Sequence, residues 1–220
     1  DIAGLTAIDH QFAKDGIHAY FLGKEVKESN GKTFERIDSF YAKDSSNYYS
    51  IKSDQINFTI ETINCNHPTF KILEYPYSQD QDRVYYEGKI FKDAQVGSFQ
   101  IIKYPYSKDK QHVYYENKII NGADPKSFAL FTENELSRGE TYYSKDKNNI
   151  YINAKPFTGV DPVTFRILDE KYTMDKSGVY YKMLKVKNAD PASFKVYPHY
   201  MGDADAEDKN HKYGDGKIVE

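Results

Sequence analysis

The side chains best able to do chemistry recur at one spacing along this sequence. An Asp is followed five residues later by a Tyr in seven places: Asp15 and Tyr20, Asp44 and Tyr49, Asp80 and Tyr85, Asp109 and Tyr114, Asp146 and Tyr151, Asp175 and Tyr180, and Asp208 and Tyr213. A carboxylate can act as a general acid or base, but an enzyme needs such a group once or twice and not in every repeat. Because an Asp side chain accepts hydrogen bonds from backbone N–H groups two residues further on, we expect the recurring Asp to fix the turn that follows it.

The recurring Tyr has two interpretations. It lies on the side of its predicted strand opposite to the apolar positions. A row of Tyr rings could stack between neighbouring units, or it could present a ligand platform, because Tyr joins an apolar ring to a polar tip. We favour stacking and keep the ligand platform as the alternative.

The sequence lacks the other common site motifs. A zinc site needs about four N or S ligands, and the available residues, without His-x-x-x-His spacing, are His10, His18, His67, His112, His199, His211 and the one Cys, Cys65. We interpret the thiol as buried or inert. Asp203, Asp205 and Glu207 begin like a calcium loop, but Asp208 and Gly214 occupy the positions of its Gly and closing Glu. We therefore expect no catalytic, cofactor-binding or metal-binding residue.

A second landmark shows that the Asp–Tyr pairs belong to a tandem repeat. A Phe follows Ser or Thr at Phe34, Phe70, Phe99, Phe128, Phe165 and Phe194. From Asp to the next Phe is 19 residues in five of six units, and from Phe to the next Asp is 10 in four of six. The basic unit is therefore about 29 residues long, with insertions of seven, eight and four. We predict a single repeat array over residues 1–220, with atypical first and last units.

Within one unit the pattern predicts short antiparallel strands. Apolar Val84 and Tyr86 alternate with polar Arg83 and Glu87, as in a half-buried strand. The following residues tolerate positive φ and predict a hairpin turn. The Asp-Pro pairs (124–125, 161–162 and 190–191) suit a single helical turn at most. Segments that contain Pro76 and Pro105 are predicted to be edge strands or bends, because Pro cannot donate to a ladder.

The predicted fold is an all-β array of about seven units stacked on one another. A closed propeller of seven blades is the alternative. We favour the open array, because the repeats of propellers are about 40–50 residues long.

Several motifs resemble the bacterial DKNYY family. They are Asp109-Lys110 with Val113-Tyr114-Tyr115, Asp146-Lys147-Asn148-Asn149-Ile150-Tyr151, and Gly122-Ala123-Asp124-Pro125-Lys126-Ser127-Phe128. The resemblance is strongest from about residue 70 to 200, and the units at Asp15 and Asp208 depart from it. It implies a bacterial source and an envelope or exported setting, without an activity or site residues.

The charge composition of the chain argues against one class of partner. The chain has 30 basic and 33 acidic residues, whereas nucleic-acid binders usually show a basic excess or stripe, so we predict no nucleic-acid partner. No apolar run approaches the roughly 18 residues of a membrane span. The 21 Tyr and 13 Phe favour strands. The sequence begins at Asp1 and has no signal-peptide pattern. We therefore expect either that a leader peptide was removed or that the first residue was chosen for recombinant expression.

The function predicted from these patterns is a non-enzymatic module, without a cofactor, that binds or spaces a protein or glycan partner at the bacterial envelope. The alternative is a carbohydrate-active enzyme with two carboxyl groups about 5 Å or 6.5–9.5 Å apart in a cleft. If the array has a dedicated binding site, we expect it at the two largest insertions, because insertions in repeat proteins form loops on the binding face. The simpler interpretation is that the insertions are surface loops without a function, because a longer loop costs little extra entropy. Those regions carry Asn64, Cys65, Asn66 and His67, and Glu133, Asn134, Glu135, Ser137 and Arg138.

The recurring pair can be tested by substitution. We expect Asp109→Ala to lower the free energy of unfolding by on the order of 1 kcal/mol, because one turn-fixing hydrogen bond is lost. Tyr114→Phe reports whether the hydroxyl has a buried partner. Chemical denaturation measures both changes, and unchanged stability with lost ligand binding would contradict the structural interpretation.

Overall fold

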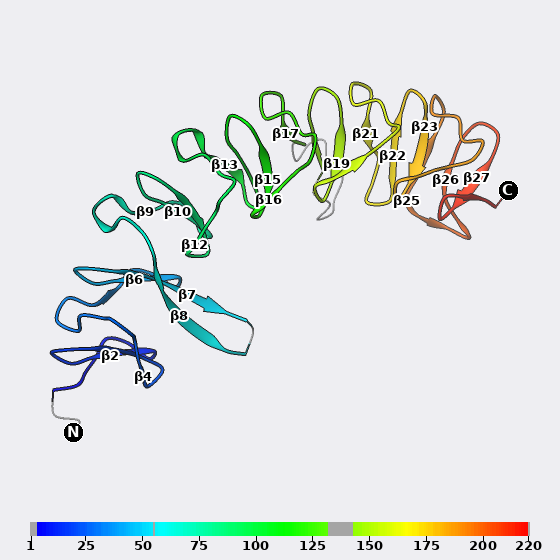
Figure 1. The fold of residues 1–220 in the computed structure, drawn as a ribbon. Helices are drawn as coiled ribbons and strands as arrows, with labels where there is room; N and C mark the ends of the chain where they lie inside the picture. The colour runs from blue at the N-terminus through cyan, green and yellow to red at the C-terminus, as the bar shows by residue number, and fades with distance from the viewer. Residues whose placement is uncertain (1–3, 55, 132–142, 220) are drawn as a thin grey trace. The chain divides into compact units, whose positions relative to one another are not determined.

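The computed structural model describes residues 4–54, 56–131 and 143–219. These residues form seven four-stranded antiparallel sheets in tandem, and none of the sheets is closed into a barrel (Figure 1). In each sheet the strands pair in chain order, as a meander. No α-helix occurs among these residues, so the predicted all-β open array of repeats is confirmed. No helix of the described segments is long and apolar enough to cross a membrane.

The sheets are numbered 1 to 7 in chain order. Sheet 1 contains β1 (Thr6–Ala7), β2 (Phe12–Lys14), β3 (Ala19–Phe21) and β4 (Lys24–Glu25). Sheet 2 contains β5 (Glu35–Arg36), β6 (Tyr41–Lys43), β7 (Tyr48–Ser53) and β8 (Phe58–Ile63). Sheet 3 contains β9 (Lys71–Ile72), β10 (Tyr77–Gln79), β11 (Val84–Tyr86) and β12 (Lys89–Ile90). Sheet 4 contains β13 (Gln100–Lys103), β14 (Tyr106–Lys108), β15 (Val113–Tyr115) and β16 (Lys118–Ile119).

The remaining three sheets follow the same plan. Sheet 5 contains β17 (Ala129–Leu130), β18 (Tyr143–Lys145), β19 (Ile150–Ile152) and β20 (Lys155–Phe157). Sheet 6 contains β21 (Arg166–Ile167), β22 (Tyr172–Asp175), β23 (Gly178–Tyr181) and β24 (Leu184–Lys185). Sheet 7 contains β25 (Lys195–Met201), β26 (Ala204–Glu207), β27 (Lys212–Gly214) and β28 (Lys217–Ile218). The chain forms two compact units, residues 1–110 with 116–118, and residues 111–115 with 119–220.

Each sheet has two different faces, which the pairing register defines. On one face, here called the back face, a small residue two positions before the recurring Asp lies opposite the recurring Tyr. The pairs are Ala13 and Tyr20, Ala42 and Tyr49, Ser78 and Tyr85, Ser144 and Tyr151, Thr173 and Tyr180, and Ala206 and Tyr213. The other face, the front face, carries the residue three before the Asp, which is aromatic in sheets 1 to 6. In sheet 7 the equivalent residue is Asp205, which is buried and accepts the hydroxyl of Tyr172 from sheet 6.

Within each compact unit the front face of one sheet packs on the back face of the next. Front-face Phe12 of sheet 1 shares a core with back-face Ala42 and Tyr49 of sheet 2. Front-face Tyr172 of sheet 6 likewise shares a core with back-face Ala206 and Tyr213 of sheet 7. The small residue leaves space for the aromatic ring, since a second bulky side chain there would overpack the interface.

This stacking corrects one sequence-based expectation. The alternation around Val84 and Tyr86 predicts a half-buried strand, but Tyr85 on the opposite face is also fully buried. Both faces of an inner sheet are covered, and a Tyr can occupy such a face because its ring is apolar. The recurring Tyr is at most 5% exposed in repeats 2 to 7. Tyr49, Tyr85, Tyr180 and Tyr213 each share a core with an aromatic ring of the preceding sheet, so their rings stack between sheets.

The connecting turns agree with the sequence in most respects. Two-residue hairpin turns have positive φ, for example Glu87 at 49° and Gly88 at 73°. The Asp-Pro segments and their equivalents form only tight or 3₁₀ turns, including η1 (His67–Thr69) and η2 (Val96–Ser98). Of the two alternatives for the Pro76 and Pro105 segments, an edge strand or a bend, the structure agrees with the second: each Pro lies in a turn that precedes an inner strand, β10 or β14.

The seven-residue insertion lies between Tyr49 and Phe70, as expected, but in a hairpin that does not include the candidate residues 64–67. It lengthens the hairpin of β7 and β8, which pair over six residues from Tyr48 and Ile63 to Ser53 and Phe58. Asn66 and His67 belong instead to the ordinary linker between sheets. The candidates of the eight-residue insertion, residues 133–138, lie outside the described residues. The four-residue insertion lengthens β25.

One hairpin turn predicts a stabilising substitution. Met183 follows Lys182 in the turn between β23 and β24 and has a φ of 71°, where a side chain is strained. We expect Met183→Gly to raise the free energy of unfolding by roughly 1 kcal/mol, because Gly adopts this conformation without that strain. The matched control is Leu184→Gly, an exposed strand residue of the same hairpin, which should destabilise the protein. Denaturant unfolding distinguishes the two, and a loss of stability in Met183→Gly would contradict the assignment.

Candidate functional site

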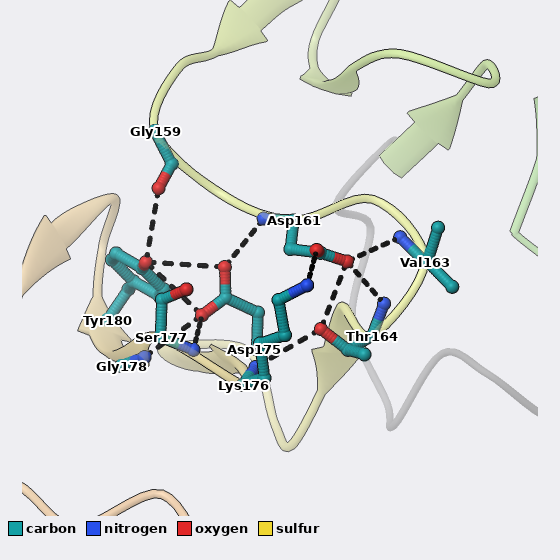
Figure 2. Close-up of polar contacts among 9 residues, drawn as sticks. All are labelled: Gly159, Asp161, Val163, Thr164, Asp175, Lys176, Ser177, Gly178 and Tyr180. Atoms are coloured by element: carbon teal, nitrogen blue, oxygen red, sulfur yellow. Dashed lines mark hydrogen bonds and ion pairs between the residues drawn. The ribbon is translucent and has the colours of Figure 1, made fainter.

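The recurring Asp is the centre of a hydrogen-bond network, as the unit around Asp175 shows (Figure 2). Its Oδ1 accepts hydrogen bonds from the backbone N–H groups of Ser177 at 2.7 Å and Gly178 at 2.9 Å. Its Oδ2 accepts the backbone N–H of Asp161 at 2.6 Å. The hydroxyl of Tyr180 lies 3.3 Å from Oδ1 and 3.4 Å from Oδ2. One carboxylate therefore fixes its turn, the recurring Tyr and the preceding linker.

The turn and Tyr contacts recur in the other units. The carboxylates of Asp44, Asp80, Asp146 and Asp208 each accept the N–H groups two and three residues further on, and the hydroxyl of the recurring Tyr, at distances of 2.6–2.9 Å. The predicted turn-fixing role of the Asp is thus confirmed.

The linker contact was not foreseen from the sequence. The N–H donor is the residue four positions before the recurring Phe, and the N–H···Oδ2 distances are 2.6–2.9 Å. The pairs are Asn30 and Asp44, Asn66 and Asp80, Gln95 and Asp109, Asp124 and Asp146, Asp161 and Asp175, and Asp190 and Asp208. In repeats without an insertion between Phe and Asp, the donor residue always lies 14 residues before the Asp. The sequence does not reveal this contact, because the donor is a backbone N–H group and the side chain at that position varies.

A second contact explains why Ser or Thr precedes the recurring Phe. The Oγ1 of Thr164 accepts the backbone N–H of Lys176, the residue after Asp175, at 3.1 Å (Figure 2). Ser or Thr makes the same contact in the other linkers, at 3.0–3.2 Å. Asp161 closes the linker turn by accepting the N–H of Thr164 at 3.0 Å, and Lys176 Nζ lies 2.5 Å from its Oδ2.

The electrostatics of these groups fit a role in holding the fold together. Burial alone would raise the pKa of Asp208, but hydrogen bonds from the N–H of Asp190, its own turn and Tyr213 lower it to about 2. The pKa values of Asp44, Asp80 and Asp146 are lowered for the same reason. Burial, and then the hydrogen bond to the carboxylate, raise the pKa of Tyr49 above its ordinary value. Ionised acids and protonated phenols of this kind hold a framework together.

The network also raises the expected cost of removing the Asp. The sequence-based figure for Asp109→Ala counts one hydrogen bond, whereas an Asp such as Asp44 accepts four. Each buried donor left without a partner costs about 1–3 kcal/mol. The loss in a buried unit should therefore be several kcal/mol.

The remaining candidates have structural surroundings. Burial and the charge of Asp80 raise the pKa of Cys65 to about 11, so that its thiol is protonated at neutral pH. His67 Nε2 lies 3.1 Å from the backbone oxygen of Asp44. Asp205, in the acidic segment, is buried and accepts the hydroxyl of Tyr172 at 2.7 Å. Within the described ranges no three His, Cys, Asp or Glu gather to hold a metal ion.

Two carboxylates line the hollow on the back face of sheet 1, Asp9 and Asp15. Asp9 pairs with Arg36 at 2.8 Å, and Asp15 accepts the N–H groups of Ile17 and His18. The pKa values of both carboxyl groups are lowered: hydrogen bonds from Arg36 and its own turn outweigh burial at Asp9, and the N–H groups of His18 and Ile17 lower that of Asp15. A glycosidase needs one carboxyl group with a raised pKa, so this pair does not favour glycoside hydrolysis.

The lengthened hairpin creates the most distinctive surface of the described residues. Strand β8 is the edge strand of sheet 2 and is six residues long, whereas the fourth strand of every other sheet has two or three (Figure 1). A groove of about 510 Å³ runs between β8 and sheet 1, lined by Leu22, Val26, Phe58 and Ile60 among others. Phe58 is 48% exposed and Ile56, at the hairpin tip, is 86% exposed.

The chain matches the model of one protein family. The DKNYY family model matches residues 1–118, 113–163 and 143–220, which together span the whole chain. No curated protein and no solved structure matches this chain.

The lowered pKa of Asp208 predicts acid sensitivity. A carboxyl group whose pKa is lower in the folded chain stabilises the fold above its unfolded pKa, and the stabilisation is lost as the pH falls through the folded pKa. With a folded pKa of about 2 against an ordinary 3.8, the free energy of unfolding should fall by on the order of 2 kcal/mol between about pH 4 and pH 2 on account of this group. Urea denaturation over this range should show a smaller fall in Asp208→Asn.

The matched control is Asp203→Asn, which changes an exposed carboxyl group near the same sheet. It should keep the wild-type fall, because Asp203 lies outside the network. An equal fall in all three proteins would exclude Asp208 as a source of acid sensitivity.

Proposed function

The chain belongs to the DKNYY family, and we propose that it is a non-enzymatic binding module that holds an extended segment of a protein partner along strand β8. The proposed setting is the bacterial envelope or its exterior, which rests on the family resemblance alone. The packing of sheet 2 against sheet 1 supports this binding edge.

The first support is the fate of the residues that could do chemistry. The recurring Asp and Tyr are buried from repeat 2 to repeat 7. Carboxylates such as those of Asp44 and Asp146 accept hydrogen bonds from the turn, the Tyr and the linker. The buried rings cannot serve as a platform for a glycan. A protein partner therefore fits the surface better than a glycan does.

The observation that carries the proposal is the exposed edge of β8. An edge strand presents a row of backbone N–H and C=O groups that another strand can pair with, and β8 offers this over residues 58–63. The fourth strands of the other sheets have only two or three residues. The seven-residue edge strand β25 of sheet 7 pairs irregularly with β26, whereas β8 pairs with β7 without interruption. Recognition by strand addition obtains affinity from backbone hydrogen bonds and specificity from pockets for alternate side chains.

The groove beside β8 defines the side chains that a partner would supply. Phe58 and Ile60 lie two residues apart in β8, so that both are on the face towards sheet 1. Leu22 and Val26 form the opposite wall of the groove. A partner segment with apolar residues at every second position would place them in this groove. The lining also contains Lys24, Lys27, Glu25 and Glu61, so that its charges are balanced.

The proposal can be tested with a random peptide library displayed on phage and selected on the full chain. We expect enriched peptides with alternating apolar residues, and at least tenfold weaker binding to Phe58→Asp, because a charge in the groove must be desolvated. A second variant, in which Asn-Gly replaces residues 51–60 to form a short turn, should lose binding. Fluorescence anisotropy of one selected peptide measures each affinity.

The matched control is Val163→Asp, the same kind of change at an apolar residue that is 87% exposed in sheet 6's preceding linker. It should bind the peptide as the wild type does. Peptides that bind Phe58→Asp and the shortened hairpin as tightly as the wild type would overturn the proposal and leave the insertion as surface slack.

A further inference from the structure

Two Asn residues of this chain, Asn30 and Asn121, are followed directly by Gly. Asn is a thermolabile residue in proteins, because the backbone nitrogen of the next residue can attack its side-chain carbonyl carbon. A following Gly hinders this attack least, since it has no Cβ. Both Asn-Gly pairs lie in linkers between sheets, but at different positions of the repeat, and their surroundings differ.

Hydrogen bonds hold both residues of Asn30-Gly31. The side-chain Nδ2 of Asn30 donates to Ser45 Oγ at 3.3 Å, and its Oδ1 accepts the N–H of Lys32 at 3.1 Å. Gly31 is buried, and its N–H donates to the carbonyl oxygen of Ile17 at 2.8 Å. A nitrogen whose proton is held in a buried hydrogen bond is a poor nucleophile. The fold therefore protects this Asn.

Asn121-Gly122 lies in a tight turn that follows β16. Both residues are exposed, and the N–H of Ala123 closes the turn by donating to the carbonyl oxygen of Ile120 at 3.2 Å. Gly122 has a φ of 79°, a conformation that Gly adopts without strain. The reacting groups of this pair thus lie at the surface, in contact with water and buffer.

The space around the two Gly residues differs in the same sense. A Cβ added to Gly31 would lie 2.4 Å from the backbone oxygens of Asp15 and His18, whereas a Cβ added to Gly122 would meet no heavy atom within 4 Å. The attack requires rotation of the backbone between the Asn and the Gly. This rotation is blocked by close packing at Gly31 and is open at Gly122.

We propose that Asn121-Gly122 is a site of spontaneous deamidation and that the fold protects Asn30-Gly31 from the same reaction. The nitrogen of Gly122 loses its proton to a base in solution and bonds to the side-chain carbonyl carbon of Asn121, while the side-chain nitrogen leaves as ammonia. Water then opens the cyclic imide at either carbonyl group. One product is aspartate, and the other is isoaspartate, in which the main chain runs through the side-chain carbon.

The products change the linker that leads to sheet 5. The new carboxylate adds a negative charge, and isoaspartate adds one atom to the main chain between buried Ile120 and Asp124. The N–H of Asp124 donates to Asp146 Oδ2 at 2.9 Å. The modification therefore acts on the segment that the recurring Asp of sheet 5 holds in place.

The test follows both sites in the full chain during incubation in mildly alkaline buffer. Trypsin then releases residues 28–32 and residues 119–126, each with a single Asn, and mass spectrometry measures the gain of one mass unit that deamidation causes. We expect residues 119–126 to be converted at least tenfold faster than residues 28–32. Chromatography should separate an aspartyl and an isoaspartyl product, with the peptide of Asn121→Asp as the aspartyl reference.

The matched control is the same chain unfolded in guanidinium chloride. Both sites then lack their folded surroundings, so the two peptides should be converted at rates within a few fold of each other. A folded protein in which Asn30 reacts as fast as Asn121 would contradict the proposal. So would an Asn121 that stays unmodified in the folded chain while it reacts in the unfolded chain, or a product that contains aspartate alone.

Discussion

The structure depends on a buried carboxylate that is fully surrounded by donors. Most strands of this protein have only two to four residues, and isolated hairpins of this size are marginal in water. The recurring Asp compensates, because one side chain joins a turn, a Tyr hydroxyl and the linker that precedes its sheet. Hydrogen bonds to a charged acceptor are stronger than those between neutral groups. Each unit is therefore held by a polar centre as well as by its apolar faces.

The apolar faces determine which face of one sheet packs against which face of the next. A large aromatic ring on the front and a small residue on the back make the two faces complementary, as between Tyr172 and Ala206. Two front faces would crowd their rings, and two back faces would leave a void beside the small residues. Packing volume alone thus orders the sheets head to tail within each compact unit. The long edge strand β8 is a departure from this regular plan.

The sequence predicts the features that repeat and misjudges those that depend on tertiary contacts. The turn-fixing Asp, the short strands and the hairpin turns follow from side-chain chemistry and from period-two alternation. Alternation alone suggests one covered face, so it cannot show that Tyr85 is buried by a neighbouring sheet. Counting residues from Asp44 to Phe70 gives the length of an insertion but not the hairpin that receives it. The candidate edge strand β8 therefore became visible only in the structure.

The meander order of the strands has a consequence for folding. Every described ladder joins strands that are neighbours in the sequence, so that forming a sheet closes only short loops. All-β proteins usually fold slowly because their strand pairings are distant in sequence, and folding rates rise as contacts become more local. This chain should fold quickly for an all-β protein. Nucleation can begin in any sheet and spread to its neighbours, as in a one-dimensional lattice.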